Sequence, residues 1–268
     1  MKVGWLFGLL LITISILVSF SNQSEVVVYF LDLPDGEATL VQGTNQQYTL
    51  INTGSKASEI YLIKFLETLE IDTIKHLIIT DNDQSYCANK DLIINKFDVK
   101  HVFDISETMN QHRTKLATPT LSKEPTSIHL DAGLTFHVLA VSNQPRSSTN
   151  VLTYNNQAIL FMGRTSITDD DIENFNKYDF QIVKTAHFGA TFLPARHILT
   201  KINPDVAIFF TSSQNETDGQ LLYYLEERWI EPYFLEDVGS LIAIFKDSDY
   251  DIEVQFRTKN MKHHINFD

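Results

Sequence analysis

Short apolar runs alternate with amphipathic segments along most of the chain, and this alternation predicts a layered fold of strands and helices. The apolar runs are rich in β-branched and aromatic residues, and turns containing Gly, Pro, Asn or Asp separate them. We expect strands over residues 26–31, 39–41, 48–51, 77–80, 100–103, 128–130, 134–141, 151–154, 158–162, 206–210 and 240–245. The first three strands should form a meander.

Helical periodicity appears between these runs. In residues 57–69, Ile60, Ile63, Leu66 and Leu69 recur at the spacing that places apolar side chains on one helix face. We expect further helices over 91–97, 194–201 and 218–228, and one that begins at Thr168, whose side chain suits a helix N-cap. Residues 107–126, which include His112, show no clear period and are predicted to be mostly loop.

The stretch from Lys75 to Cys87 carries the most informative chemistry. The apolar residues 77–79 end abruptly in a polar turn that contains Asp81, Asp83 and Ser85. Loops at strand ends are held by a rigid scaffold yet stay open to solvent, so sites are often built there. Taken alone, these residues favour a simple polar turn after a core strand, because short motif matches are often accidental.

The same stretch resembles the first metal-binding motif of the metallo-β-lactamase superfamily, Thr-His-x-Asp/His-x-Asp-His. Thr80 and Asp83 match that pattern, whereas Asp81, Ser85 and Tyr86 stand where the superfamily has His, Asp and His. The segment 183–190 resembles the superfamily motif Lys-Val-Gly-His-His-Gly-Ser. Its matching residues are Lys184, His187 and Gly189, and Phe188 replaces a histidine.

The opening strands resemble one branch of the superfamily, the extracellular domain of bacterial competence DNA-uptake proteins. That branch opens with Asp-Val-Gly-Gln-Gly-Asp-Ala, which Asp32, Gly36 and Ala38 match, and Glu37 is a near match. Asn52-Thr53-Gly54 stands where the branch has Asp-Thr-Gly. The resemblance implies an α/β four-layered αββα sandwich over residues 25–268.

The resemblance also implies a set of site residues. Asp81, Asp83 and His187 are the candidate metal ligands, and Asp83 and His187 are the candidate catalytic residues. The predicted cleft residues are Asp32, Asn52, Thr80, Tyr86 and Arg164. Zinc or manganese would be the cofactor of a metal-dependent phosphodiesterase or nuclease with one metal ion. Because several ligand positions have changed together, a non-catalytic binding or scaffolding role without a cofactor is the preferred hypothesis.

Arg164 stands where the superfamily has an aspartate that bridges two metal ions. A guanidinium cannot be a metal ligand, but its planar fork suits carboxylates and remains charged at any relevant pH. We therefore predict that Arg164 occupies the position of the lost cation and binds Asp81, Asp83 or both. The alternative is that Arg164 turns outward into solvent.

The N-terminal segment predicts export. Residues 3–20 are uncharged and mostly apolar, and a polar stretch follows them, which is typical of a cleaved signal or a signal anchor within residues 1–24. Either outcome places the remaining chain outside the cytoplasmic membrane.

Cys87 is the single cysteine, so the domain has no internal disulfide. Burial of this thiol is favoured over thiol catalysis with His187.

The formal net charge of −13 opposes non-specific nucleic-acid binding, which depends on neutralising phosphates. The resemblance to a DNA-uptake domain still leaves nucleic acid open as a partner. A protein or a small ligand that enters the cleft is the preferred class of partner.

Overall fold

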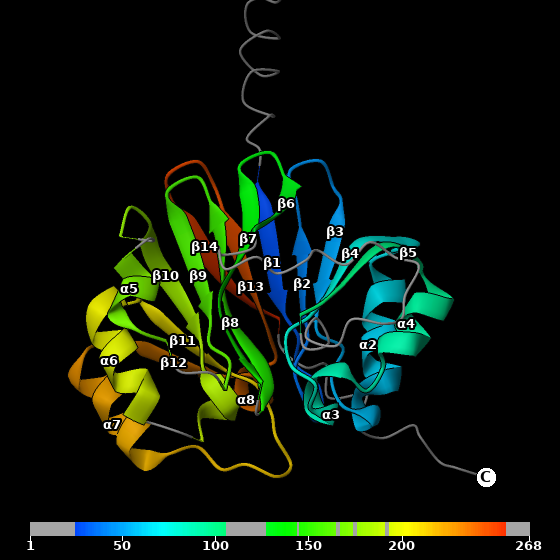
Figure 1. Cartoon of the computed structure of the whole chain (residues 1–268). Coiled ribbons are helices and arrows are strands. Elements are labelled where there is room, and N and C mark those ends of the chain that lie inside the picture. The colour runs from blue at the N-terminus through cyan, green and yellow to red at the C-terminus, as the bar shows by residue number, and fades with distance from the viewer. Residues whose placement is uncertain are drawn as a thin grey trace, which may run out of the picture.

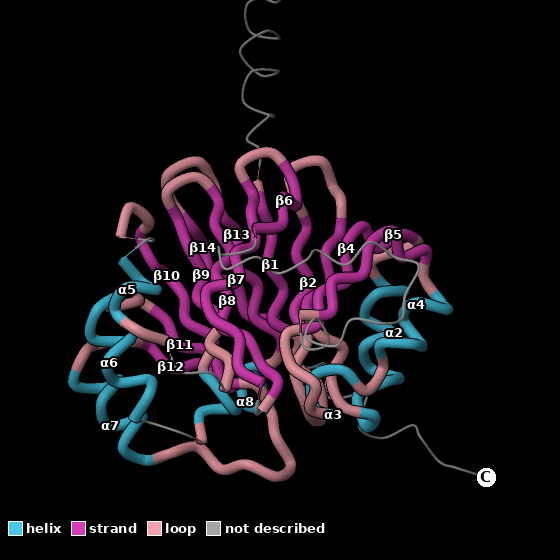
Figure 2. Tube along the Cα trace, in the orientation of Figure 1, coloured by secondary structure: helices cyan, strands magenta, loops and turns pink. Residues whose placement is uncertain are grey.

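The computed structural model describes residues 25–105, 127–143, 145–164, 167–173, 176–190 and 193–255 of the 268. Two seven-stranded sheets pack face to face, as Figures 1 and 2 show. The first sheet has the order β14 (Tyr250–Gln255), β13 (Ser240–Phe245), β1 (Val26–Phe30), β2 (Thr39–Gln42), β3 (Tyr48–Ile51), β4 (Thr73–Ile79) and β5 (Asp98–Asp104). The second has the order β12 (Glu231–Phe234), β11 (Val206–Phe209), β10 (Asp179–Lys184), β9 (Gln157–Phe161), β8 (Arg146–Tyr154), β7 (Leu134–Asn143) and β6 (Ser127–Asp131).

Each sheet is antiparallel in one half and parallel in the other. Strands β3, β4 and β5 run parallel in the first sheet, and β9, β10, β11 and β12 run parallel in the second. Parallel strands need crossover connections, and helices supply most of them here. The carboxyl ends of β4, β9 and β10 therefore become the places where side chains from different strands can meet.

The core lies between the sheets because alternate side chains of each strand point inward. In β1, Val26, Val28 and Phe30 are fully buried and belong to a cluster that includes Phe136 and Phe161 of the other sheet. The intervening residues of β1 are only half-buried. The β-branched and aromatic residues of this segment predicted the strand, and its packing in the sheet sets the alternation of burial.

Helices cover the outer face of both sheets (Figure 1). Leu62 and Leu66 of α2 (Glu59–Thr68), together with Ile93 of α4 (Lys90–Lys96), pack on the first sheet. The second sheet is covered by α5 (Asp169–Glu173), α6 (Leu193–Ile202) and α7 (Gly219–Glu227). Short helical turns complete the chain: Lys56–Ser58, α3 (Gln84–Cys87), Ala186–Gly189 and α8 (Leu235–Val238). The predicted αββα sandwich is confirmed.

Some predicted boundaries were wrong. Strand β4 begins at Thr73 rather than residue 77, because Thr73 and Ile74 already pair with β5. Residues 147–150, predicted to connect elements, belong to β8, where pairing with β7 satisfies their backbone and buries their polar side chains. Three strands were not predicted: the central strand β10 and the edge strands β12 and β14. In β14, half-buried residues alternate with exposed polar ones.

The predicted helix start at Thr168 is confirmed. The Thr168 hydroxyl donates to Asp171 Oδ2 at 2.7 Å, and the Asp171 backbone N–H donates back to the Thr168 hydroxyl at 3.3 Å. The predictions for residues 1–24 and 107–126, including His112, lie outside the described residues. Within the part of the chain that is described, no helix is long and apolar enough to cross a membrane.

Candidate functional site

The polar turn after β4 is joined to the opposite sheet by backbone hydrogen bonds. The Ser148 N–H donates to the Thr80 carbonyl at 2.9 Å, and the Asn82 N–H donates to the Arg146 carbonyl at 3.0 Å. Asp81 and Ser147 form an isolated antiparallel bridge between these two contacts. The turn that carries the candidate site is therefore held to β8 as a short stretch of extra sheet.

Arg164 lies just after β9 and binds Asp81 in this turn. Its Nε donates to Asp81 Oδ2 at 2.9 Å, and its Nη2 donates to Asp81 Oδ1, so the guanidinium holds both carboxylate oxygens. The Arg164 backbone N–H donates to the Ser147 hydroxyl at 2.9 Å, which anchors the residue. The Asp81 side chain is 2% exposed and that of Arg164 is 19% exposed. The predicted ion pair is therefore present and largely shielded from water.

The electrostatics of Arg164 agree with this geometry. Burial alone would lower the pKa of the guanidinium, but the hydrogen bond and the charge of Asp81 raise it. Asp83 adds a weaker attraction, with 3.6 Å between Arg164 Nη1 and Asp83 Oδ2. Arg164 is thus a permanent positive charge between two carboxylates.

Asp83 has a second role as the N-cap of α3. Its Oδ1 accepts from the Ser85 N–H at 2.9 Å, and its own N–H donates to Asp81 Oδ1 at 2.8 Å. The Asp83 side chain is 43% exposed, so it is the more accessible of the two carboxylates. Helix capping accounts for one of its oxygens, and Arg164 faces the other.

Beneath this pair lies a second ion pair, which the sequence did not predict. Lys184, the last residue of β10, is 2.8 Å from Glu37 Oε2, and both side chains are 3% exposed. Lys184 also donates to the Met162 carbonyl at 2.8 Å. Burial raises the pKa of Glu37, although the Lys184 charge opposes this shift. Glu37 and Lys184 had been singled out only as matches to family motifs.

Three of the residues predicted to line a cleft lie in the interior beneath the site instead of on an open surface. Asn52, Thr80 and Tyr86 are all buried. Asn52 donates to Glu37 Oε1 at 2.9 Å and accepts from the Thr80 N–H at 2.9 Å, so it links the buried ion pair to the turn. Asp32 lies beside β13, where its backbone N–H donates to the Ser240 hydroxyl at 2.9 Å.

His187 follows β10 in a strained conformation. His187 has φ 47° and Phe188 has φ 59°, a left-handed geometry that disfavours residues other than Gly. Phe188 is buried with its ring 5.5 Å from that of Tyr86, so packing compensates for the strain. Burial lowers the pKa of His187, and the Arg164 charge lowers it further. His187 therefore belongs to the same site and favours its neutral form.

Cys87 does not have the properties of a nucleophile. Burial raises the pKa of the thiol to about 11, and its Sγ lies 3.3 Å from the Asp83 carbonyl as a donor. Thiolate is the reactive form of cysteine, so this thiol is inert at neutral pH. The geometry agrees with the packing role that the sequence favoured.

The residues present do not fit a catalytic metal ion. Among the described residues, no three His, Cys, Asp or Glu side chains form a group that could hold one. Of the candidate ligands Asp81, Asp83 and His187, the first has both oxygens bound to a guanidinium. A metal ion would have to displace Arg164 and would meet its positive charge.

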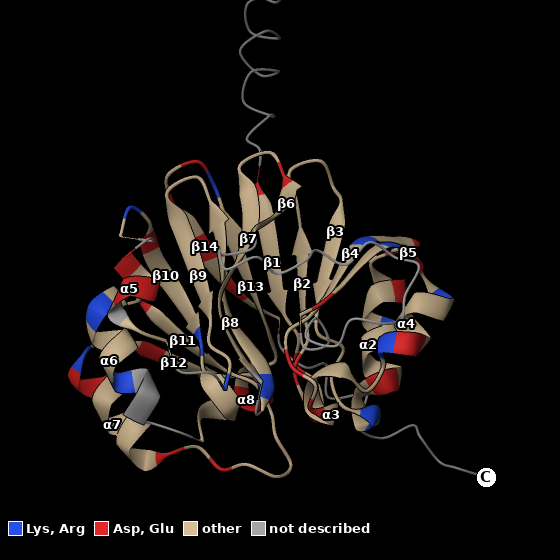
Figure 3. Cartoon of the chain, viewed as in Figure 1, with Lys and Arg blue, Asp and Glu red and all other residues tan. Residues whose placement is uncertain are grey.

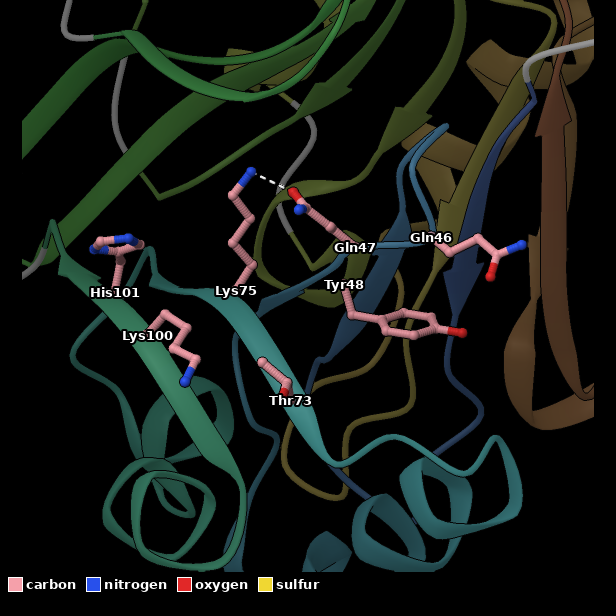
Figure 4. Close-up of a pocket in the computed structure, with 7 residues that line it drawn as sticks. All are labelled: Gln46, Gln47, Tyr48, Thr73, Lys75, Lys100 and His101. Carbon is pink, nitrogen blue, oxygen red and sulfur yellow. Dashed lines mark hydrogen bonds between the residues drawn. The ribbon is translucent and has the colours of Figure 1, made fainter.

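A hollow of about 350 Å³ lies at the other end of the first sheet, away from this site (Figure 4). It is lined by Gln46, Gln47, Tyr48, Thr73, Lys75, Lys100 and His101. Its two cations already have partners: Lys75 donates to Gln47 and to the Leu130 carbonyl, and Lys100 pairs with Asp98. These contacts favour a structural role for the lysines over an anion-binding role.

Comparison with solved structures identifies the architecture. The chain resembles YhfI from Bacillus subtilis, a metallo-β-lactamase fold protein, with a TM-score of 0.57 and 10% identity over 86% of this chain and 100% of that one. The chain has the metallo-β-lactamase fold. A diphosphatase of the PhnP family is similar too, with a TM-score of 0.55 and 12% identity over 84% of this chain and 99% of that one. No family model and no curated protein sequence matches the chain.

At 10% and 12% identity, the similarity to these solved structures establishes a shared fold but not a shared activity. The chemistry has to be inferred from the residues of the site, and the Arg164–Asp81 pair is the feature that decides it.

Proposed function

We propose that this metallo-β-lactamase-fold protein is a non-catalytic binding or scaffolding protein, exported to or anchored on the outer face of the cytoplasmic membrane through residues 1–24. The observation that supports the non-catalytic role is the Arg164 guanidinium bound to both oxygens of Asp81. The observation that supports export is the uncharged apolar run of residues 3–20.

Two-metal hydrolysis needs about six or more ligands around a pair of cations that clamp the attacking and leaving oxygens. Here a side-chain cation takes the place of a metal ion and neutralises Asp81. Glu37 and Lys184 neutralise each other beneath it. The buried charges of the site, Asp81 with Arg164 and Glu37 with Lys184, are thus paired with each other, and removing Arg164 to admit a metal would leave the buried Asp81 charge without its partner.

The alternative is a hydrolase with one zinc or manganese ion on Asp81, Asp83 and His187 that acts on phosphodiesters. Resemblance to a DNA-uptake domain favours nucleic acid as its substrate. The net charge of −13 opposes this, because phosphate contacts supply most nucleic-acid affinity. In the view of Figure 3, the positions of acidic and basic residues are interspersed along the described elements.

Metal analysis combined with an activity assay distinguishes the two functions. The full chain, purified without chelators, is analysed by mass spectrometry for bound metals and assayed with bis(4-nitrophenyl) phosphate and with DNA, in the presence of zinc or manganese. We expect far less than one metal ion per chain and no cleavage above the rate of an Asp83→Ala variant. One metal ion per chain, with cleavage that Asp83→Ala abolishes, would establish the hydrolase.

A further inference from the structure

Trp229 has an unusual position at the end of α7. The helix closes with two backbone hydrogen bonds, Ile230 N–H to the Leu225 carbonyl at 3.0 Å and Trp229 N–H to the Glu226 carbonyl at 3.2 Å. This pair of bonds is the Schellman motif, in which the residue at the position of Trp229 is left-handed and is usually Gly. Trp229 has φ 60°, and the residue is 92% exposed.

The fold gains little from a tryptophan at this position. A left-handed conformation costs a residue with a side chain about 1 kcal/mol or more relative to Gly. The neighbours of Trp229 do the packing instead: Ile230 is buried in the outer core of the second sheet, and the Arg228 guanidinium lies 5.4 Å from the Tyr224 ring. The indole itself remains in solvent, so its presence requires an explanation other than stability.

The exposed residues near Trp229 along the chain are aromatic and acidic. Tyr223, on the exposed face of α7, is 63% exposed. Glu226, Glu227 and Glu231 lie within three residues of Trp229 and are exposed. Arg228 offsets one of these charges but is directed over the buried Tyr224 ring. An exposed aromatic ring beside carboxylates has the chemistry that attracts a cationic side chain.

We infer that Trp229, Tyr223 and the carboxylates of Glu226, Glu227 and Glu231, together called the Trp229 surface, form a docking site for a lysine- or arginine-bearing segment of a protein partner. Tryptophan is among the residues most enriched at interface hot spots. The cation would lie over the indole, and the carboxylates would set the orientation of the segment.

Three other occupants of the Trp229 surface are disfavoured: a second copy of the chain, an anionic lipid surface and a strand added to the edge of the sheet. A second copy of the chain would bring the same carboxylates and the same net charge of −13 to the contact. An anionic lipid surface would repel the three glutamates. Addition of a partner strand to β12, the edge strand that follows Trp229, is hindered because Pro232 has no N–H to donate.

Figure 1 shows α7 at the opposite end of the molecule from the beginning of β1, so a chain anchored before β1 would present this surface away from the membrane.

The test uses fluorescence anisotropy with labelled peptides on the full chain. The probes are an oligo-lysine, an oligo-arginine and an oligo-glutamate peptide of equal length. Trp229→Gly is the decisive variant because it changes no charge and suits the left-handed backbone, so it separates the Trp229 surface from general attraction to an acidic protein. Ile60→Ser, at another exposed apolar residue on α2, is the matched control. A variant with Gln at positions 226, 227 and 231 tests the carboxylates.

We expect saturable binding of the basic peptides, weakened at least tenfold by Trp229→Gly and by the triple Gln variant and unchanged by Ile60→Ser. Trp229→Gly should keep or raise the melting temperature. Equal binding to wild type and Trp229→Gly would overturn the inference, as would an absence of basic-peptide binding. Preference for the acidic peptide or for anionic vesicles, or dimerisation that Trp229→Gly abolishes, would assign the surface to a different occupant. The measurement does not depend on metal content, so its failure would leave the proposed non-catalytic site standing.

Discussion

At the scale of single residues, one arginine decides the chemistry of the candidate site. Arg164 neutralises a carboxylate that is 2% exposed, and an unpaired charge in such a place is very unfavourable. The pair need not stabilise the fold relative to two apolar residues, but each partner requires the other. This mutual dependence leads to a direct test.

Arg164→Ala should lower the free energy of unfolding by about 3 to 5 kcal/mol, because it leaves the Asp81 charge buried without a partner. The measurement is urea denaturation. Adding Asp81→Asn to Arg164→Ala should recover a large part of the loss, since the charge is then removed as well. Lys96→Ala, which breaks an exposed pair with Glu67, is the control and should cost about 1 kcal/mol or less. An Arg164→Ala loss no larger than that of Lys96→Ala would show that the pair is not effectively buried.

A second prediction concerns His76 of β4, which is buried and stacked on His101 with 5.6 Å between ring centroids. Burial, helped by the charges of Lys75 and His101, lowers the pKa of His76 from 6.5 to about 4. The unfolded state therefore binds a proton between pH 6.5 and pH 4 that the folded state does not, and stability falls as the pH is lowered through this range.

The expected loss from this group over this range is about 3 kcal/mol at most. His76→Phe keeps an aromatic ring and removes the titration, so its stability should change less between pH 6.5 and pH 4 than that of the wild type. Chemical denaturation at several pH values measures the difference. Parallel pH profiles for the two proteins would mean that His76 titrates alike in the folded and unfolded states.

At the scale of elements, the site depends on how closely β9 approaches β8. Gly163 follows β9, and a Cβ at this position would lie 2.1 Å from the Ser148 carbonyl oxygen and 2.9 Å from the Ser147 hydroxyl. The Gly163 N–H donates to the Thr149 hydroxyl at 3.0 Å. The absence of a side chain at Gly163 thus allows Arg164 to reach Asp81 across β8.

Gly163→Ala should destabilise the fold by about 2 to 3 kcal/mol, because the methyl group would overlap backbone that cannot easily move. Gly219→Ala is the matched control: nothing lies within 4 Å of a Cβ at this first residue of α7. That variant should be neutral or more stable by up to about 1 kcal/mol, since Ala restricts the unfolded chain. Thermal and urea denaturation of both variants gives the comparison; equal and small effects would contradict the close approach of β9 to β8.

At the scale of the whole molecule, side chains tie the two sheets together near both ends. Asp131, at the end of β6, accepts from the Thr44 hydroxyl at 3.0 Å and from the Asn45 N–H at 2.9 Å, in the turn between β2 and β3. Asp35 accepts from the Ser213 N–H at 2.7 Å, which links the connection after β1 to the loop after β11. These hydrogen bonds between protein groups connect the first sheet to the second.

If no metal ion contributes to the native state, chelators should leave the stability of the whole molecule unchanged. A ligand that binds only the folded state raises its stability by mass action, so its removal would lower the melting temperature. We expect the same midpoint in differential scanning calorimetry with and without EDTA, and no increase when zinc or manganese is added. A midpoint that falls by several degrees in EDTA would contradict the proposed site.

The sequence by itself located most of the strands and helices, and its resemblance to a known superfamily predicted how they are layered. Alternation and helical periodicity are local patterns, so they located β1, β3, β13, α2 and α7 within a few residues. They missed β10, the edge strands β12 and β14, and the polar first half of β8, because pairing with neighbouring strands rather than a clear local pattern places those segments in the sheets. The Arg164–Asp81 contact was predictable only through the resemblance, which assigned both residues to one site.

Tertiary structure alone decided the rest. Glu37 and Lys184 are 147 positions apart, and no local pattern says that the ends of their strands meet in a buried ion pair. Nor could the sequence show that Asn52 and Tyr86 would be buried or that Trp229 would be exposed in a left-handed turn. Exposure and pairing depend on which elements pack together, and that packing is a property of the whole chain.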